Sequence, residues 1–511
     1  MHVAFSVNDF IDRAELVYPD RVAVVDEPEQ PAGSWGELTY AELARRARAL
    51  AAGLDELGIA PGERIAVVSH NSARLLTAFF GVCGSGRVLV PVNFRLSPHE
   101  VGYIVEHSGA SVLLIDPEVE ASLAGVEAKH RFVLGADADA QLLRYDVEPQ
   151  AWEPDENATA TINYTSGTTA RPKGVQITHR NIWVNAVTFA LHVTASDRDV
   201  YLHTLPMFHA NGWGMPFALT GLGVRHVVLR KVDGAEILRR IESQGVTLLC
   251  AAPAVVNAVL AAASDWSGPI PGAGRVRVVC AGAPPPSRTI ERIETELGWE
   301  FIQIYGLTET SPLLTVNRRR QEDDALSPAD AAVKLARAGA PAIGVRLKIS
   351  DQDEVLARSN VVLEGYWAQP EATADAIVDG WFHTGDGGSI DAEGHLVISD
   401  RKKDIIITGG ENVSSIEVED ALFSHPAVAE VCVLGVPDEK WGETVKALVV
   451  LEPGAKATER ELIDHARERL AHYKCPTSVE FRDVLERTAT GKLQKFKLRA
   501  PYWQGLERAV N

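Results

Sequence analysis

The sequence predicts an α/β protein with a large N-terminal domain of several subdomains and a small α+β domain at the C-terminus. Short apolar runs alternate with helical patterns over most of the chain, as in layered α/β folds with parallel sheets. The runs are apolar at successive positions, which is typical of strands buried on both faces. Near residue 400 the charged segment DRKKD marks a change in character. We therefore expect domains at 1–399 and 404–511, joined by residues 400–403.

Length and charge limit the kinds of protein that this chain can be. Its 511 residues, of which 46% are apolar and 23% charged, are typical of a globular protein of roughly two to four domains. Lys and Arg number 50 against 69 Asp and Glu, and the net charge of -19 argues against a nucleic-acid-binding surface. A polyanionic ligand must therefore find its hydrogen-bond donors and cations locally.

The cysteines and the N-terminus indicate a cytoplasmic protein. The five cysteines lie far apart without a CxxC pair, which favours reduced thiols over a disulfide framework or a zinc site. The N-terminus MHVAFSVNDF lacks the basic start and the apolar run of a secretion signal. No stretch reaches the roughly 20 apolar residues that span a bilayer, so we expect no integral membrane segment.

Helix and strand signals follow one another closely in the N-terminal domain. Thr39 and Glu42 form a capping box for a helix with leucines at helical spacing, which ends at Gly58. The most polar segment, 317–332, is expected to be a surface excursion. The expected buried strands are 64–69, 87–92, 110–116, 247–252 and 275–282.

The segment after residue 404 has the signals of a compact unit. Two strand-like stretches, 428–436 and 444–453, precede a second capping box made by Thr458 and Glu461. The apolar residues of the following helix that are expected to face inward are Leu462, Ile463, Ala466 and Leu470. An α+β unit of about 110 residues is large enough to fold around its own core.

The most informative segment is INYTSGTTARPKGV, residues 162–175. Glycine lets backbone N–H groups approach phosphate oxygens, and successive turn amides form a concavity that binds anions. Lys173 adds one positive charge. The spacing is not that of a Walker A loop, because Lys173 follows Gly167 by six residues and precedes a glycine. The expected phosphate-binding residues are Thr165, Ser166, Gly167, Thr168, Thr169 and Lys173, and Thr178 is expected to cap the next helix.

This segment resembles the signature of the adenylate-forming superfamily, which includes acyl-CoA synthetases, nonribosomal peptide adenylation domains and beetle luciferases. The overall likeness is greatest to bacterial fatty-acyl-CoA ligases. Ala170 stands where the family usually has glycine, which predicts a slightly stiffer loop. The resemblance implies that ATP activates a carboxylic acid as its acyl-adenylate, with the help of Mg²⁺.

Companion motifs in the family's order extend the resemblance over almost the whole chain. YGLTETSP (305–312) resembles the segment in which Tyr305 lies against adenine, Thr308 contacts the nucleotide and Glu309 holds the Mg²⁺ ion. The chemistry agrees, since Mg²⁺ prefers one or two carboxylates together with phosphate oxygens and water. AGAPPP (281–286) resembles a segment that lines the adenine and acyl pockets through Gly282 and Ala283.

Further motifs imply contacts near and beyond the domain boundary. WFHTGD (381–386) ends in Asp386, which the resemblance places on the ribose hydroxyls, and Arg401 would contact the ribose or the phosphates. Lys403 falls at the family's hinge, about which the small C-terminal domain is mobile. Lys492 matches the catalytic lysine that meets the substrate carboxylate and the α-phosphate.

The resemblance also implies a second half-reaction with coenzyme A. Gly409 and Gly410 would let its pantetheine arm pass close to the backbone. Trp441 and Tyr473 match positions that contact coenzyme A in related aryl-CoA ligases. His209 in LPMFHANGWG (205–214) would stand between the adenylate and the tunnel that admits the thiol.

The residues expected to line the acyl cavity do not determine which carboxylic acid the protein binds. None of its expected wall residues is a cation, which argues against a dicarboxylic acid, whereas a medium or long fatty acid and an aryl acid both fit. The expected wall is made by Ala210, Asn211, Gly282, Ala283, Gly306, Leu307 and Leu313.

Three hypotheses for the function follow. The first is a ligase that forms a thioester with coenzyme A. The second is an adenylating enzyme that transfers the acyl group to a carrier-protein thiol or another nucleophile. The third is a nucleotide-binding regulator without turnover, against which the complete set of charged motif residues argues. The sequence leaves the oligomeric state open, with a homodimer as one option.

Overall fold

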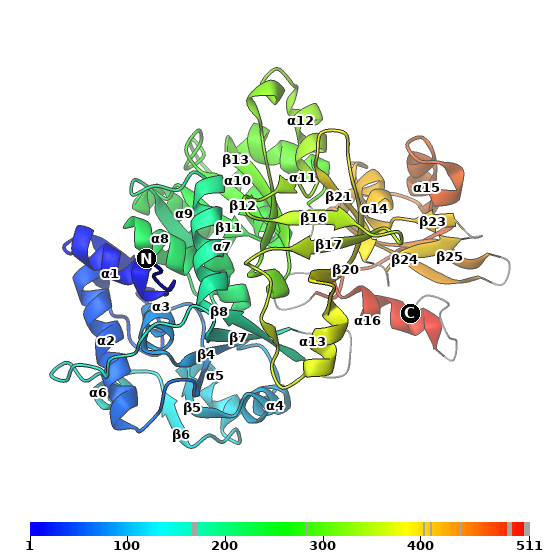
Figure 1. Cartoon of the computed structure of the whole chain (residues 1–511). Helices are drawn as coiled ribbons and strands as arrows, with labels where there is room; N and C mark the ends of the chain where they lie inside the picture. The colour runs from blue at the N-terminus through cyan, green and yellow to red at the C-terminus, as the bar shows by residue number, and fades with distance from the viewer. Residues whose placement is uncertain are drawn as a thin grey trace.

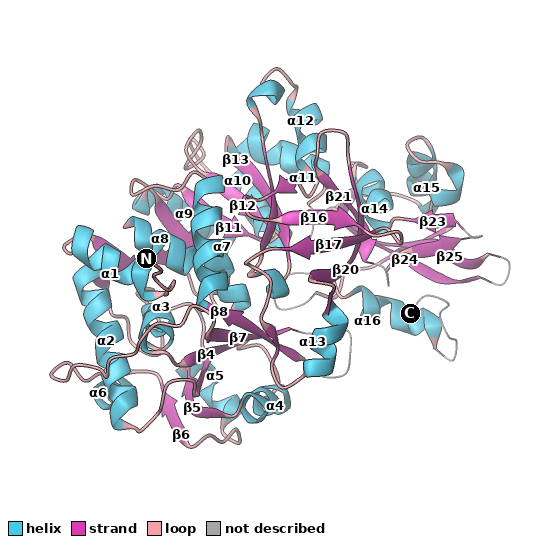
Figure 2. Ribbon diagram, in the orientation of Figure 1, coloured by secondary structure: helices cyan, strands magenta, loops and turns pink. Residues whose placement is uncertain are grey.

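The computed structural model describes residues 1–165, 172–282, 285–401, 404–408, 411–438, 441–487 and 493–504, without the side chains of residues 400 and 401. A large body, coloured blue to yellow in Figure 1, contains the N-terminal residues, and a smaller unit in orange and red lies at its side. Both parts mix helices and strands, as Figure 2 shows. The α/β fold class and the large and small domains expected from the sequence are therefore confirmed.

Two large sheets make up the centre of the N-terminal body. Within the described residues, the first is a seven-stranded sheet whose order is β18 (Gly365–Tyr366), β8 (Lys173–Thr178), β7 (Thr159–Thr165), β4 (Val88–Val92), β3 (Arg64–Val68), β5 (Ala110–Ile115) and β6 (His130–Val133). The second is a nine-stranded sheet whose order is β15 (Ala340–Pro341), β14 (Leu313–Arg318), β13 (Glu300–Gly306), β12 (Arg277–Cys280), β11 (Leu248–Ala251), β9 (Val200–His203), β10 (Arg225–Val228), β1 (Val22–Val25) and β2 (Glu37–Thr39).

Two smaller sheets complete the described strands. The third sheet belongs to the N-terminal body and contains β16 (Arg346–Ile349), β17 (Glu354–Arg358), β20 (Trp381–Ile390), β19 (Ile377–Val378) and β21 (Leu396–Arg401). The C-terminal unit is built on the fourth, with β23 (Glu411–Val413), β22 (Ile406–Thr408), β25 (Gly442–Leu451), β24 (Val428–Asp438) and β26 (Ser478–Phe481).

Helices cover these sheets. Those of the N-terminal body are α1 (Asn8–Val17), α2 (Tyr40–Glu56), α3 (Ala73–Gly81), α4 (Pro98–Ser108), α5 (Pro117–Glu120), α6 (Ala136–Leu142), α7 (His179–His192), α8 (Met215–Leu222), α9 (Gly234–Gln244), α10 (Pro253–Ser264), α11 (Ser287–Arg292), α12 (Pro328–Leu335) and α13 (Pro370–Ala376). The C-terminal unit has α14 (Ser415–Phe423), α15 (Glu459–Arg467) and α16 (Lys495–Arg499). Short helical turns used below are η3 (His209–Gly214), η5 (Thr308–Thr310) and η7 (His472–Lys474).

Local sequence signals explain where several of these elements begin. The Thr39 and Glu42 capping box precedes α2, and the Thr458 and Glu461 box precedes α15. Thr178 caps α7 as expected. The strands β3, β4 and β5 pair in parallel and are almost entirely buried, so their continuous apolar runs have the expected cause.

The segment 317–332 is more ordered than expected from its polarity. Arg318 ends β14, and Pro328–Leu335 forms α12, which buries Ala331, Ala332 and Leu335. The charged side chains of the segment are held in ion pairs, among them Arg318 with Glu300. The middle of the segment is largely exposed, as expected of a surface excursion, whereas its ends belong to β14 and α12.

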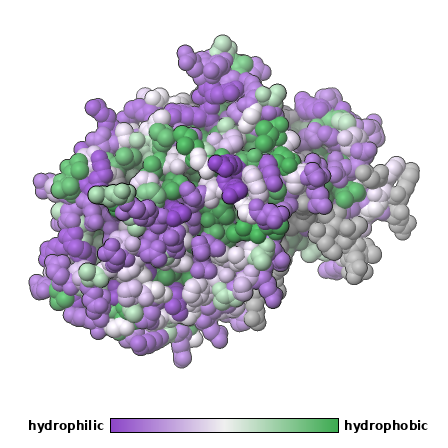
Figure 3. Space-filling view, in the orientation of Figure 1, coloured by the Kyte–Doolittle hydropathy of each residue, from purple (hydrophilic) through white to green (hydrophobic). Residues whose placement is uncertain are grey.

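The outer surface and the cysteines agree with the composition. Figure 3 shows a largely hydrophilic face with apolar side chains between the polar ones. All five cysteines are buried free thiols. None of the helices in the described part of the chain combines the length and the apolarity needed to cross a bilayer.

Candidate functional site

The flanks of the phosphate loop are two paired strands. β7 and β8 run antiparallel, and Thr165 at the end of β7 is in register with Lys173 at the start of β8. The pair therefore fixes the two ends of the loop at the edge of the seven-stranded sheet. The loop residues Ser166, Gly167, Thr168 and Thr169 lie outside the described residues.

Tyr366 connects Lys173 to Glu309, the residue that the family resemblance implies for Mg²⁺. The Lys173 Nζ atom is 4.7 Å from the centroid of the Tyr366 ring, a cation–π distance. The Tyr366 hydroxyl donates a hydrogen bond of 3.0 Å to Glu309 Oε1, and the Leu363 N–H donates one of 2.8 Å to the Glu309 carbonyl. One tyrosine thus contacts both the loop lysine and the acidic residue.

Tyr366 stays a hydrogen-bond donor in this position. Burial raises the pKa of Tyr366 above its usual value, and the adjacent Glu309 carboxylate raises it further. The sequence did not reveal Tyr366, because it reaches the site through the pairing of β18 with β8, where Tyr366 is opposite Val175. No local pattern predicts a contact between strands so far apart in the chain.

A second pair of expected site residues meets directly. The Tyr305 hydroxyl donates a hydrogen bond of 2.8 Å to Asp386 Oδ2. Asp386 lies on β20, with its side chain buried, and in strand register with Arg401 at the end of β21. Thr308 lies in η5, half-buried, three residues after Tyr305. The structure therefore brings Tyr305 and Asp386 into contact, whereas the Arg401 side chain and Ala283 lie outside the described residues.

The segment that starts at His209 has an unusual backbone. Ala210, Asn211 and Trp213 have φ values of 38°, 48° and 57°, in the left-handed region that non-glycine residues rarely occupy. Such a turn persists only where its surroundings hold it, and it is often found at functional sites. His209 itself is half-buried at the start of this turn.

Asn71 holds the loop that leads to His209. Its Oδ1 atom accepts a hydrogen bond of 2.8 Å from the Met207 N–H. Its Nδ2 donates to the carbonyls of His203 at 3.0 Å, Leu205 at 3.0 Å and Leu229 at 3.1 Å. Because Asn71 follows β3 and these partners follow β9 and β10, one side chain joins the two large sheets beside the segment.

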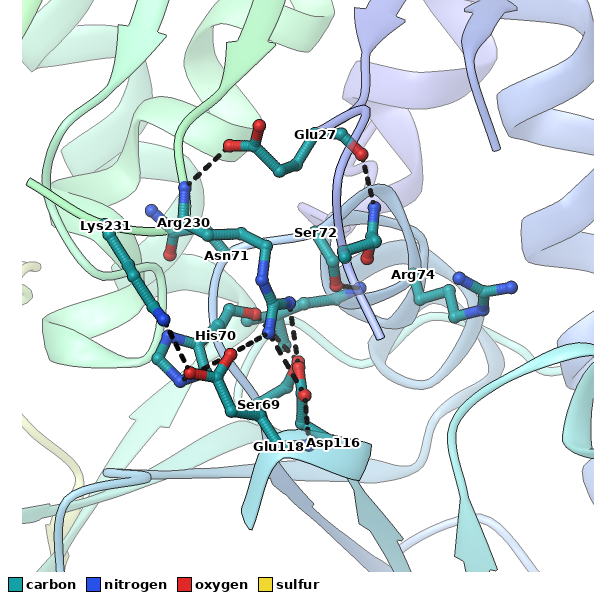
Figure 4. Close-up of polar contacts among 12 residues, drawn as sticks. Glu27, Ser69, His70, Asn71, Ser72, Arg74, Asp116, Glu118, Arg230 and Lys231 are labelled. Atoms are coloured by element: carbon teal, nitrogen blue, oxygen red, sulfur yellow. Dashed lines mark hydrogen bonds and ion pairs between the residues drawn. The ribbon is translucent and has the colours of Figure 1, made fainter. Parts of the chain in front are cut away.

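Charged side chains fill the space next to Asn71 (Figure 4). The buried Arg230 guanidinium contacts both carboxylate oxygens of Asp116, at 2.9 and 3.1 Å, and Glu118 at 3.0 Å. Lys231 is 2.8 Å from the other oxygen of Glu118, and this contact, with help from Arg230, lowers the pKa of Glu118 to about 2. Burial, followed by the charge of Arg230, lowers the pKa of the neighbouring His70. The sequence analysis did not identify this cluster.

Aromatic contacts connect the cluster to the His209 segment. The His70 ring stacks on Phe94 with centroids 3.7 Å apart, and Phe94 meets Phe208 edge to face at 5.6 Å. A neutral His70 suits this stack, because a charged imidazolium would lie beside Arg230. The packing therefore fixes the residue directly before His209.

Part of the expected acyl wall lies in one apolar cluster. Ala210 and Leu313 both belong to it, at 4% and 1% exposure, together with Ile304. Gly306 is required where the chain passes itself, since a Cβ atom there would lie 1.5 Å from the Pro312 carbonyl oxygen. Gly282 is the last described residue before a short gap, and Ala283 lies within that gap. Leu307 is partly buried and packs against the main hydrophobic core.

The expected residues of the C-terminal unit are described only in part. Trp441 precedes β25 and is 49% exposed, and Tyr473 in η7 is 45% exposed. Lys403, Gly409, Gly410 and Lys492 lie outside the described residues. The unit contacts the N-terminal body where Asp420 accepts hydrogen bonds of 3.0 and 2.9 Å from the N–H and the hydroxyl of Ser287.

One group of possible metal ligands lies on the turn between β20 and β21. Asp391, Glu393 and His395 place ligand atoms within 4.8 Å of one another. Arg337 Nη1 already lies 2.9 Å from Asp391 and 2.7 Å from Glu393, and Lys334 also contacts Glu393. A cation would have to displace the arginine, so the trio is an ion-pair network.

Comparison with known proteins agrees with this geometry. The AMP-binding enzyme family matches residues 11–367, and the AMP-binding enzyme C-terminal domain matches residues 417–492. A 4-hydroxybutyrate–CoA ligase of Metallosphaera sedula is 37% identical over 96% of this chain and 93% of its own length. A feruloyl-CoA synthase of an Amycolatopsis species is 36% identical over 90% of this chain and 93% of its own length.

The structural likeness extends over both domains. The o-succinylbenzoate CoA synthetase of Bacillus subtilis, solved with its acyl-adenylate intermediate, aligns with a TM-score of 0.82 and 31% identity, covering 96% of this chain and 97% of that one. The chain therefore belongs to the AMP-binding enzyme family within the adenylate-forming superfamily.

Within that family it is an AMP-forming acyl-CoA synthetase. It uses ATP to activate a carboxylic acid as the acyl-adenylate and then forms the thioester with coenzyme A. Of the three hypotheses drawn from the sequence, the first is thus the one that the relatives support.

Proposed function

We propose that the ATP phosphates bind between β7 and β8, on the amides and hydroxyls of the loop and on Lys173. The observation that carries this proposal is the contact of Tyr366 with both Lys173 and Glu309. It supports a single site that holds the phosphates and the residue expected at their cation. The loop residues assigned to the phosphates are Thr165, Ser166, Gly167, Thr168 and Thr169.

Glu309 fits a Mg²⁺ ion in its donor chemistry. Its carboxylate is half-buried and oriented by the Tyr366 hydroxyl, and phosphate oxygens would supply further oxygen ligands. When bound, Mg²⁺ neutralises charge on the phosphates and on the departing pyrophosphate. We assign no other described carboxylate to the ion.

The nucleoside part of ATP is assigned to the residues around Tyr305. The contact between the Tyr305 hydroxyl and Asp386 supports a shared place for adenine and ribose, and a carboxylate is the usual partner of a ribose diol. Thr308, Gly282 and Ala283 complete the adenine side, and Arg401 the ribose or phosphate side.

In the first half-reaction, a carboxylate oxygen of the acid attacks the α-phosphorus of ATP and pyrophosphate leaves. Carboxylate, α-phosphate and pyrophosphate are all anions, so the protein must supply positive charge and N–H donors at fixed positions. Lys173 and the loop amides serve the phosphates, and Lys492 serves the carboxylate and the α-phosphate. Removing one such donor typically lowers the rate by about 10²–10³.

The second half-reaction is assigned to a different arrangement of the two domains. We place the domains at 1–399 and 404–511, with the hinge at 400–403 and Lys403 at the pivot. The described hydrogen bonds between the two parts join Ser287 to Asp420, Arg288 to the His425 carbonyl and Ser414 to the Ser399 carbonyl, a polar contact that is compatible with a C-terminal unit that moves. Gly409, Gly410, Trp441 and Tyr473 would then contact coenzyme A, and His209 would control access of its thiol to the adenylate.

The acid is proposed to be a monocarboxylic acid with an uncharged acyl group, either a fatty acid or an aryl acid. The absence of cations among the described wall residues supports this, since a second carboxylate would need one. Of two relatives, one is named for the aryl acid ferulate and the other for 4-hydroxybutyrate, a short-chain acid outside the expected medium or long fatty acids; neither acid has a second carboxylate. A homodimer and a cytoplasmic location stay predictions.

The proposal is tested with a panel of fatty and aryl acids, incubated with ATP and Mg²⁺, with and without coenzyme A. We expect pyrophosphate from the accepted acids under both conditions, and AMP together with a thioester only when coenzyme A is present to take the acyl group. Failure to release pyrophosphate with every acid would contradict the assignment.

Replacement of Lys492 separates the two half-reactions. We expect Lys492→Ala to lower pyrophosphate release by about 10²–10³, because its charge acts on the carboxylate and the α-phosphate. Conversion of a supplied acyl-adenylate to the thioester should continue. Lys497→Ala, which removes an exposed cation from α16, is the matched control and should leave both steps unchanged. If Lys492→Ala lowered adenylation and thioester formation equally, the proposal that Lys492 acts only in adenylation would be wrong.

A further inference from the structure

A small cluster of buried polar side chains lies beside the His209 segment. It consists of Thr161 and Asn163 on β7 and Asn211 in η3, and we call it the β7 amide cluster. The three side chains are 0%, 3% and 3% exposed. Asn211 Nδ2 donates a hydrogen bond of 2.8 Å to Thr161 Oγ1, and Asn163 Nδ2 donates one of 3.0 Å to the same oxygen.

The other half of each amide has no partner. Asn163 Oδ1 and Asn211 Oδ1 are buried acceptors, and neither makes a hydrogen bond to any residue that the structure describes. Thr161 Oγ1 already accepts two hydrogen bonds, so its own proton is the group left to donate. Buried polar atoms in proteins are nearly always paired, so an unpaired set indicates a partner such as a ligand group or an ordered water.

The cluster lies between two parts of the proposed active site. Side chains two residues apart on a strand share a face, so Thr161, Asn163 and Thr165 point to the same side of β7. Thr165 opens the phosphate loop. Asn211 follows His209 by two residues and belongs to the expected acyl wall. The cluster thus borders the expected acyl wall through Asn211 and the phosphate loop through β7.

We propose that the β7 amide cluster binds a hydroxyl group carried by the acyl chain of the acid, so that the enzyme prefers hydroxylated carboxylic acids. A hydroxyl donates one hydrogen bond to one of the two amide oxygens and accepts one from Thr161, so it pairs two of the three groups left over. A second carboxylate does not match, because it offers acceptors only and would face two amide oxygens. This inference rests on the proposed function of the same site.

The test compares acids that differ only in this group. The 2-, 3- and 4-hydroxybutyrates are each paired with the acid in which a methyl group replaces the hydroxyl, and kcat/KM is measured from AMP release. For at least one pair we expect the hydroxy acid to be favoured by about tenfold or more, roughly the factor that one net hydrogen bond supplies. Equal kcat/KM values within every pair would overturn this inference alone. No AMP from any acid would overturn the proposed function as well.

Two variants assign the preference to the cluster. Asn163→Leu is close to isosteric in an extended strand, and Asn211→Gly removes the amide without straining the positive φ of 48°. Each should lower the ratio of kcat/KM for the favoured hydroxy acid to that for its methyl partner by about tenfold. An unchanged ratio in both variants would overturn the assignment and leave an ordered water as the partner of these atoms.

A buried amide whose hydrogen bonds go to backbone carbonyls, away from the β7 amide cluster in the sequence, serves as the control. Asn317 on β14 is 3% exposed and donates to the Lys334 and Arg337 carbonyls at 2.8 and 3.1 Å. Asn317→Leu should lower the thermal stability but keep the ratio for hydroxy and methyl acids. A fall of the ratio in Asn317→Leu equal to that in Asn163→Leu would show a general structural effect and overturn the assignment.

Discussion

Two buried polar groups on either side of the His209 segment differ in how completely their side chains are paired. Around Arg230, the guanidinium has two contacts with Asp116 and one with Glu118, at side-chain exposures of 4% for Arg230 and 1% for Asp116. In the β7 amide cluster, each amide uses its N–H and leaves its oxygen without a described partner. Arg230 and Asp116 are about as buried as the amides, but their charged groups are paired with each other.

This difference in pairing distinguishes side chains that stabilise the scaffold from side chains that are proposed to bind a substrate. A buried charge is tolerated only with its partners, so a complete network fixes the elements that carry it. Arg230, Asp116 and Asn71 follow strands of both large sheets and hold these strand ends together. A half-paired amide costs free energy in the empty protein and gains a partner only when a ligand arrives. The two groups should therefore respond in opposite ways to substitution.

The largest effect is expected for Asp116→Asn. Asparagine keeps the shape and the oxygen that caps α5, but it removes the charge that balances Arg230. Arg230 then keeps only the partly exposed Glu118 as its counter-ion. Because breaking a buried ion pair is costly, we expect a loss of roughly 3 kcal/mol in the free energy of unfolding. Urea denaturation followed by tryptophan fluorescence measures it.

A double variant shows whether the charge is the cause. Arg230→Met combined with Asp116→Asn removes both charges, and it should lose less stability than Asp116→Asn alone. A loss below about 1 kcal/mol for the single variant, or a larger loss for the double one, would mean that this network does not hold the two sheets.

A smaller effect is expected on acidification. The folded pKa of Glu118, about 2, lies below the ordinary value of 4.5, so its contribution to stability is complete above pH 4.5 and is lost as the pH falls toward 2. The pKa of His70 is also lowered, because burial disfavours its charged form, so the folded state takes up this proton less readily than the unfolded chain below pH 6.5. Both groups make the protein less stable in acid.

Thermal melting between pH 7 and pH 4 tests this sign. Glu118 is partly exposed, so solvent screens its ion pairs. We therefore expect the loss of its contribution between pH 7 and pH 4 to lower the free energy of unfolding by only roughly 0.5–1 kcal/mol. Glu118→Gln should therefore give a shallower fall of Tm below pH 5 than the unchanged chain. A parallel fall in both proteins would show that Glu118 does not couple to folding.

The features that local chemistry determines could be predicted from the sequence. A capping box depends on residues three apart, so Thr39 and Thr458 gave the starts of α2 and α15. The continuous apolar run of β3 predicted its burial. The turn-and-lysine pattern between β7 and β8 predicted a loop, and the strand register at Thr165 and Lys173 agrees with it.

Contacts between distant segments could not be predicted in this way. Tyr366 reaches Glu309 only because β18 pairs with β8, and Asp116 meets Arg230 across 114 positions of the chain. The left-handed turn at Asn211 depends on its surroundings, since its sequence alone has no preference strong enough to impose it. Packing also explains why the polar segment 317–332 contains the end of a strand and a helix.

The smallest effect, and the sharpest contrast with Arg230, is expected for the stability of Asn163→Leu. The substitution removes an acceptor that has no described partner and one donor to Thr161, which keeps its hydrogen bond from Asn211 at 2.8 Å. Replacing a half-paired amide by an apolar side chain of similar shape is nearly neutral, so we expect a change within about 0.5 kcal/mol by urea denaturation. A loss comparable to that of Asp116→Asn would mean that the β7 amide cluster also belongs to the scaffold, and the contrast between the two groups would disappear.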